Sequence, residues 1–252
     1  PTLGGGLAGF TSDGEELQVL AFGLWIAPSP IAVKNVAYFG GYDSTFYLYD
    51  FFLGHPIRTV KTRGSIVTAP TLTPLNRVLF GSLDSKIYAI NRDGEVLWRK
   101  KLDSPLSHHP TASEGGLCYA LTETGTLYAL DEETGETLWI MEKQVLFPPS
   151  LNYSGDLTLL TRTGEVARVG KLGSIKWLSQ GPSLPSAPPI TDYFGALWVP
   201  FEANRLVVYS PSGDVAAEFE TPSPLIALVP TGAKSIYGIS QNAQFIRFRQ
   251  AV

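Results

Sequence analysis

A glycine that recurs about every 40 residues is the feature that most limits what this chain can fold into. The series is Gly14, Gly54, Gly94, Gly135, Gly173 and Gly213, with steps of 40, 40, 41, 38 and 40 residues. A proline series runs in phase with it, at Pro30, Pro70, Pro110, Pro149, Pro189 and Pro230. Because two independent markers share one period, the sequence predicts a repeated structural unit.

Each unit contains four short apolar segments, and the turn glycine joins the third segment to the fourth. The third segments align best, and they are Leu7–Ser12, Thr45–Asp50, Lys86–Asn91, Thr126–Asp131, Glu165–Gly170, Arg205–Ser210 and Gln244–Arg249. Their side chains alternate with the period of two that is typical of β-strands. Four strands in about 40 residues predict an all-β fold, a β-propeller of four-stranded antiparallel blades.

We expect a single propeller domain over residues 1–252, with about six repeats. Residues 1–20 would form a partial unit, residues 21–220 five full units, and residues 221–252 a second partial unit. Two arrangements remain open: strands from both termini close the ring, or the chain is part of a longer propeller. We favour closure, because it removes an exposed strand edge that would otherwise promote aggregation.

Composition excludes several classes of partner. The formal net charge of -4 gives no broad cationic surface, so nucleic acid is not an expected partner. The longest apolar run contains Pro28 and Pro30, which makes it unsuitable as a membrane-spanning helix. The single cysteine, Cys118, excludes an intrachain disulfide and a four-thiolate metal site.

Tryptophan follows the turn glycine by four residues in three consecutive units, at Trp98, Trp139 and Trp177. A ring at the start of the fourth strand is well placed to fill the space between neighbouring blades. We therefore interpret these residues as packing elements, and truncation to alanine should cost about 3–5 kcal/mol.

The segment ALDEETGETLW, from residue 129 to residue 139, matches the pattern AxDxxTGxxxW at Ala129, Asp131, Thr134, Gly135 and Trp139. This pattern resembles the repeat of the pyrroloquinoline-quinone-like (PQQ-like) propeller family, and residues 86–98 are a near match. The resemblance implies one of two groups: quinoprotein dehydrogenases, or non-catalytic propellers such as sensor domains and the periplasmic scaffold of outer-membrane barrel assembly.

The dehydrogenases of this family are typically eight-bladed and place a disulfide of adjacent cysteines over the quinone, which a chain with only Cys118 lacks. The resemblance therefore favours a non-enzymatic scaffold or ligand-sensing propeller, without a cofactor, in the periplasm or outside the cell. Two alternatives stay open: a PQQ- or metal-dependent dehydrogenase-like enzyme, and a carbohydrate-binding propeller.

In such a propeller one face collects the segments between fourth and first strands and between second and third strands. The residues expected on this channel face are Trp25, Tyr42, Arg63, His108, His109 and Phe147. Aromatic and arginine side chains often anchor interfaces, so we expect another protein or a small ligand to bind here. Adjacent residues of an extended chain point in opposite directions, so the histidine pair is a poor metal site. We predict neither catalytic residues nor metal ligands.

Overall fold

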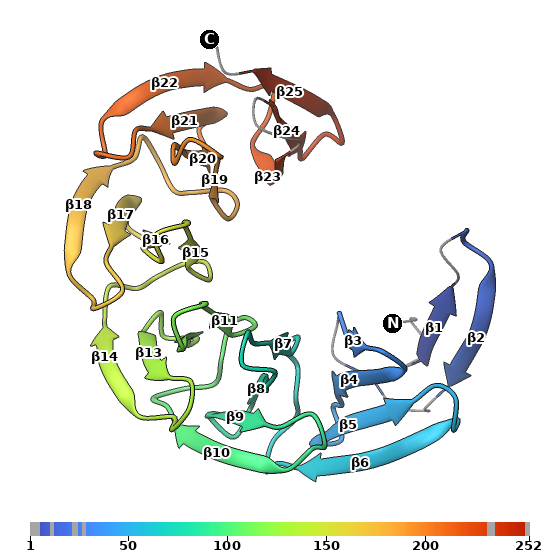
Figure 1. The fold of residues 1–252 in the computed structure, drawn as a ribbon. Coiled ribbons are helices and arrows are strands. Elements are labelled where there is room, and N and C mark those ends of the chain that lie inside the picture. Colours follow the sequence, from blue (N-terminus) through green and yellow to red (C-terminus); the bar gives the residue numbers. More distant parts are fainter. Residues whose placement is uncertain (1–5, 11–12, 22–24, 27–28, 231–234, 250–252) are drawn as a thin grey trace. The chain divides into compact units, whose positions relative to one another are not determined.

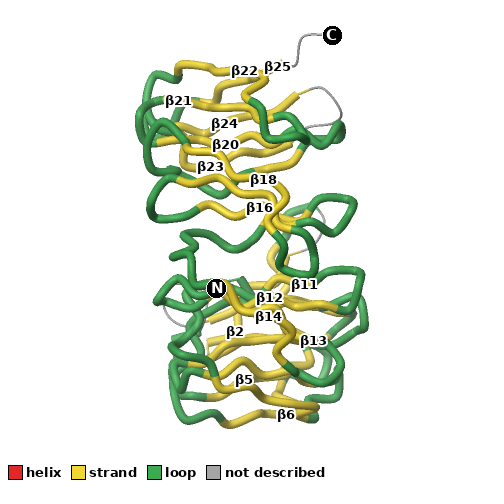
Figure 2. Tube along the Cα trace, turned by 90° about the vertical axis from the view of Figure 1, so that its left-hand side faces the viewer, coloured by secondary structure: helices red, strands yellow, loops and turns green. Residues whose placement is uncertain are grey.

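The computed structural model describes residues 6–10, 13–21, 25–26, 29–230 and 235–249. Every regular element in this part of the chain is a β-strand, and Figure 2 shows only strands and loops there. None of the described segments forms a helix with the length and hydrophobicity that crossing a membrane requires. The all-β prediction is therefore confirmed.

Five antiparallel sheets have four strands each, and in every one the strands are neighbours in chain order. The first two sheets consist of β3 (Ile31–Val33), β4 (Val36–Gly40), β5 (Thr45–Asp50) and β6 (His55–Lys61), then β7 (Thr71–Leu72), β8 (Val78–Ser82), β9 (Lys86–Ile90) and β10 (Val96–Lys101). The third consists of β11 (Thr111–Ala112), β12 (Leu117–Leu121), β13 (Leu127–Asp131) and β14 (Thr137–Met141). The last two consist of β15 (Ser150–Leu151), β16 (Leu157–Leu160), β17 (Glu165–Val169) and β18 (Ile175–Gln180), then β19 (Ile190–Thr191), β20 (Leu197–Phe201), β21 (Arg205–Tyr209) and β22 (Val215–Glu220).

Two smaller sheets come from the ends of the chain. β1 (Gly6–Phe10) pairs with β2 (Glu16–Ala21), and β23 (Leu225–Pro230), β24 (Ser235–Ser240) and β25 (Phe245–Arg249) form a three-stranded sheet. These strands lie in the segments where the sequence predicts two partial units. Closure of a ring by their strands remains a prediction.

The chain divides into two compact units. Unit 1 consists of Pro1–Thr124 and Tyr128–Leu138, and unit 2 consists of Gly125–Leu127 and Trp139–Val252. Figure 1 shows that within unit 1 the fourth strands β6 and β10 follow each other along the outer edge.

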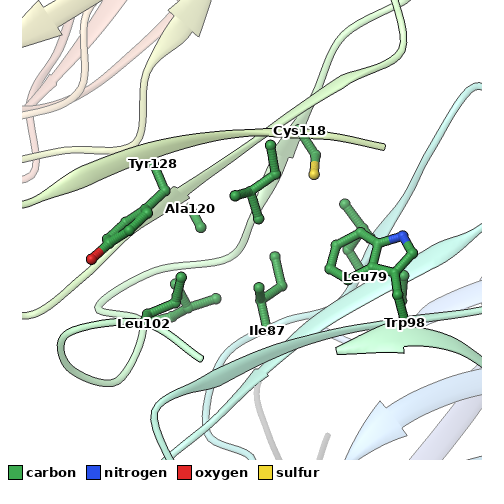
Figure 3. Close-up of a cluster of buried hydrophobic side chains, with 10 residues drawn as sticks. Leu79, Ile87, Trp98, Leu102, Cys118, Ala120 and Tyr128 are labelled. Carbon is green, nitrogen blue, oxygen red and sulfur yellow. The ribbon is translucent and has the colours of Figure 1, made fainter. Parts of the chain in front are cut away.

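Neighbouring sheets within a unit pack face to face through buried apolar side chains. In unit 1, Phe46 of β5 stacks on Phe80 of β8 with a centroid distance of 4.0 Å. A second cluster of unit 1 joins the β7–β10 sheet to β12 and β13, and includes Leu79, Trp98 and Cys118 (Figure 3). In unit 2, Val166 of β17 belongs to one cluster with residues of β20 and β21.

The turn between third and fourth strands has the geometry that its sequence predicts. Asp131 Oδ1 accepts hydrogen bonds from the backbone N–H of Thr134 at 2.8 Å and of Glu133 at 2.9 Å. These bonds, with one from the Thr134 hydroxyl, outweigh partial desolvation and lower the pKa of Asp131. Gly135 has a φ of 74°, in the left-handed region that side chains disfavour. Asp131, Thr134 and Gly135 therefore serve the turn itself.

Each of the three tryptophans lies on the turn glycine of the next sheet. A Cβ atom on Gly135 would come within 2.6 Å of the Trp98 ring, one on Gly173 within 3.0 Å of Trp139, and one on Gly213 within 2.6 Å of Trp177.

The same indole rings hydrogen-bond the turn that they cover. The Nε1–H groups of Trp98, Trp139 and Trp177 donate to the carbonyl oxygens of Glu132 (2.9 Å), Lys171 (2.9 Å) and Pro211 (3.0 Å). One side chain thus provides both an apolar contact and a polar contact between neighbouring sheets.

The proline series opens the first strand in five sheets, since β3, β7, β11, β15 and β19 each begin directly after it. Pro230 differs, because it ends β23 and pairs with Ile236. In the β19–β22 sheet the pairing at the corresponding place is interrupted. Pro185 forms an isolated bridge to Phe201, and the first strand, β19, begins only at Ile190, directly after Pro189. Pro230 is tolerated because β23 is an edge strand of its sheet.

We predict that Gly135→Ala destabilises the protein more than Gly54→Ala. Both glycines occupy the same turn position with φ values of 74° and 73°, but Gly54 has no atom near its missing Cβ. The shared backbone strain should cost about 1–2 kcal/mol in each variant. Gly135→Ala must also displace the Trp98 ring, which should add about 1–3 kcal/mol. Urea denaturation measures the difference, and equal losses would contradict the proposed contact.

Candidate functional site: the loop face

The candidate site is built from two kinds of segment, which we call connections and turns. A connection links the fourth strand of one sheet to the first strand of the next, and a turn links the second strand to the third. In each unit, the connections and turns together form what we call the loop face.

A recurring backbone hydrogen bond ties each turn to the connection that leads into its sheet. The N–H to O distances are 2.8–3.0 Å for Tyr42 to Trp25, Leu83 to Ser65, Glu123 to Pro105, Arg162 to Gln144, Glu202 to Leu184, and Gln241 to Pro224. The residue that follows the carbonyl acceptor in the connection is buried, as with Ile66 after Ser65 and Leu106 after Pro105. The loop face therefore presents its variable side chains on a fixed backbone.

Exposed apolar side chains gather on the loop face of unit 1. Trp25 is 68% exposed and Tyr42 48%, and their rings meet edge to face with a centroid distance of 6.4 Å. Leu83, 43% exposed, occupies the position in the next turn that Tyr42 occupies in its own. Ser65 joins the two turns, because its hydroxyl donates to the Tyr42 carbonyl at 2.6 Å and its carbonyl accepts from the Leu83 N–H. We call Trp25, Tyr42 and Leu83 the apolar patch.

Arg63 has an exposed side chain and lies in the connection between β6 and β7, two residues before Ser65. Its backbone N–H donates to Asp84 Oδ2 at 3.3 Å, and the Tyr88 hydroxyl donates to the same oxygen at 2.6 Å. Burial alone would raise the pKa of Asp84, but these bonds and the Lys86 ammonium group lower it. Burial and the Asp84 carboxylate together raise the pKa of Tyr88. Asp84 is thus an ionised acceptor that holds the turn, and the Arg63 guanidinium faces solvent.

His108 and His109 lie in the connection between β10 and β11. His108 is half-buried, and its Nδ1 is 2.9 Å from the Ser107 hydroxyl oxygen. Burial lowers the pKa of both imidazoles, and the neighbouring His109 lowers that of His108 further. Among the described residues, no group of three or more His, Cys, Asp or Glu side chains is placed to hold a metal ion.

Phe147 lies in unit 2, in the connection between β14 and β15. It is partly buried and packs against the cluster that contains Val199 and Phe201. Its ring therefore contributes to packing between the β15–β18 and β19–β22 sheets. An additional contact with a partner would involve only the exposed part of the ring.

Leu83 is the residue of the apolar patch that sequence reasoning missed. It follows Tyr42 by 41 residues, which is one repeat, so the period itself was the available signal. The later turns carry Glu123, Arg162, Glu202 and Gln241 at this position. Of these six turns, those of the β3–β6 and β7–β10 sheets therefore carry an apolar residue at this position, and the other four carry a charged or amide residue.

We predict that His108 remains neutral at pH 7 and makes the fold sensitive to mild acid. Its pKa is lowered in the folded protein, whereas an unfolded histidine titrates near 6.5. Below about pH 6.5 the unfolded chain binds more protons, so the free energy of unfolding falls as pH falls. Urea denaturation at pH 7.5 and 5.5 should show a smaller loss in His108→Gln than in the unmodified protein. Identical losses in the two proteins would contradict this assignment.

The repeats, with motif residues that serve packing and a loop face that displays exposed aromatic side chains on a fixed backbone, define the class of PQQ-like β-propellers. Residues 58–224 match the family model described as outer membrane protein assembly factor BamB, and the chain belongs to this family. By this description the family is one of assembly factors rather than of quinone-dependent dehydrogenases, and the resemblance expected from the sequence is confirmed.

Curated relatives agree with this assignment. The outer membrane protein assembly factor BamB of Nitrosomonas eutropha is 27% identical over 185 residues, which is 73% of this chain and 39% of the relative. The protein of the same name from Burkholderia pseudomallei is 25% identical over 130 residues, which is 52% of this chain and 33% of the relative. The match thus spans well under two thirds of the length of these relatives.

Solved structures show the same fold. The crystal structure of BamB from Moraxella catarrhalis superposes with a TM-score of 0.80 at 18% identity, over 99% of this chain and 78% of that one. The computationally designed protein Ika8 superposes with a TM-score of 0.76 at 15% identity, over 94% of this chain and 75% of the design. The propeller architecture predicted from the 40-residue period is confirmed.

Proposed function

We propose that this chain is a non-enzymatic scaffold that takes part in outer-membrane protein assembly by binding another protein through the apolar patch of its loop face. The family description supports the process, because the matched relatives are named as outer membrane protein assembly factors. The same description supports a periplasmic location, since an assembly factor must reach the outer membrane from that side.

The observation that carries the proposal is the joint exposure of Trp25, Tyr42 and Leu83 on a rigid backbone. Aromatic residues dominate binding energy at interfaces, and rigid presentation lowers the entropy cost of association. The exposed Arg63 beside them adds a second residue type that interfaces favour.

Site-specific photocross-linking in cells tests the surface directly. Benzoylphenylalanine at Tyr42 should cross-link a subunit of the outer-membrane protein assembly machinery. The same probe at Phe52 is the matched control, because Phe52 is 89% exposed and lies in the β5–β6 turn, at the other end of β5. We expect a product at Tyr42 and none at Phe52.

A leucine pair in one sheet supplies the affinity test. Leu83 lies in the β8–β9 turn and Leu75 in the β7–β8 turn, with exposures of 43% and 51%. Tyr42→Ala together with Leu83→Ser should weaken binding by about 2 kcal/mol or more, roughly 30-fold, whereas Leu75→Ser should not. Equal binding by all variants, or cross-linking at Phe52 alone, would overturn the proposal.

A further inference from the structure

A row of side chains crosses the β15–β18 sheet of unit 2 on the face that meets the next sheet. The row is set by strand register, which pairs Ser150 with Thr158, Thr158 with Arg168, and Arg168 with Trp177. Directly paired residues place their side chains on one face of a sheet. The Arg168 guanidinium lies 5.9 Å from the centroid of the Trp177 ring, as this arrangement requires.

The facing row belongs to the β19–β22 sheet. Register pairs Thr191 with Leu197 and Leu197 with Tyr209. Trp177 stacks on Tyr209 with a centroid distance of 6.0 Å and an interplanar angle of 25°. That contact brings the two rows together, so that Arg168 and Thr158 face the row that contains Thr191. We call Thr158, Arg168 and Thr191 the polar seam.

Each member of the seam has a buried polar atom without a hydrogen-bond partner in the structure. These atoms are Arg168 Nη1, Thr158 Oγ1 and Thr191 Oγ1. Arg168 is only 3% exposed and Thr158 only 1%. A buried donor without an acceptor costs about 1–3 kcal/mol, and more when it is charged. All three groups can donate a hydrogen bond, so a shared acceptor would satisfy them together.

In unit 1 the three positions that correspond to the polar seam are apolar. There Trp98 pairs with Ala89 and Ala89 with Leu79, and the next sheet contributes Ala112 paired with Cys118. Leu79, Ala89, Trp98 and Cys118 form one buried cluster (Figure 3). Arg168 therefore stands where the repeat has Ala89, Thr158 where it has Leu79, and Thr191 where it has Ala112. Packing of two blades does not itself require polar residues at these positions.

Among the described residues, Arg168 forms no ion pair with a carboxylate. The acid whose charge acts on it is Asp156, whose Oδ2 is 2.7 Å from the Lys176 ammonium nitrogen. Glu218, which acts on Tyr209, is paired with Arg205 at 2.6 Å. Each carboxylate thus has its own cation, and a guanidinium stays protonated inside proteins. An unpaired buried charge is costly, which favours binding of an anion.

We propose that the polar seam binds one small inorganic anion of the size of chloride, held by Arg168 Nη1 and the hydroxyls of Thr158 and Thr191. Such an anion satisfies all three donors and neutralises the guanidinium. A water molecule would accept hydrogen bonds but would leave the charge uncompensated. The bound anion would link the β15–β18 sheet to the β19–β22 sheet and stabilise unit 2.

Thermal unfolding at constant ionic strength tests this site in the full chain. Replacing gluconate by chloride or bromide should raise the unfolding midpoint by about 2–4 °C with saturation. The triple variant Thr158→Leu, Arg168→Ala, Thr191→Ala has the residues that unit 1 carries at the three corresponding positions and should lose this response. Arg205→Ala removes an exposed arginine and should keep it, which controls for anion binding at the surface.

Crystals grown with bromide give a second readout that needs no variant. An anomalous peak in contact with Arg168 Nη1 and both threonine hydroxyls is the expected result. The proposal is overturned if the seam shows only water without anomalous signal, or if the unmodified protein shows no halide response. It is also overturned if the triple variant folds and responds as the unmodified protein does.

Discussion

The contact between a tryptophan ring and the turn glycine of the next sheet is the interaction on which this architecture depends. Trp98, Trp139 and Trp177 each occupy the space in which a Cβ atom of the next turn glycine would lie. Each indole N–H also satisfies a carbonyl of that turn. At these three turns glycine is thus required both for its left-handed backbone and for the ring, which accounts for the common spacing of the three tryptophans and these three glycines.

This packing lies at one end of the third strand and leaves the loop face at its other end free to vary. The turn position occupied by Tyr42 and Leu83 in unit 1 carries charged or amide side chains in the later sheets. The backbone bond from turn to connection is the same in all of them. A constant framework with variable side chains at one end is a suitable basis for a binding protein. The apolar patch differs from the same positions of the later sheets in its side chains and not in its backbone hydrogen bonds.

Sequence reasoning could predict what depends on local geometry and period. Gly135, Asp131 and the third strands follow from turn chemistry and alternation, and β5, β9, β13, β17, β21 and β25 begin and end within one residue of the expected positions. What sequence reasoning missed depends on contacts between sheets. Phe147 reads as an exposed loop aromatic, but it is partly buried by residues about 50 positions further along the chain.

Arg168 is a second residue whose environment the sequence does not show. In the sequence it reads as an ordinary alternating residue of a strand, because its burial depends on the neighbouring sheet. Pro230 shows that even a regular series can change role, because the pairing of β23 with β24 resumes at Ala227 after a register shift and extends up to this proline. Periodicity thus gives the position of an element, and only the packed structure gives the environment of its side chains.

A double-mutant cycle between Trp98 and Gly135 tests the central contact most directly. If the ring occupies the space at the glycine, the stability cost of Gly135→Ala in the Trp98→Ala background should fall to that of Gly54→Ala. The coupling free energy should then be about 1 kcal/mol or more. A cost of Gly135→Ala that is unchanged by removal of the Trp98 ring would contradict the account.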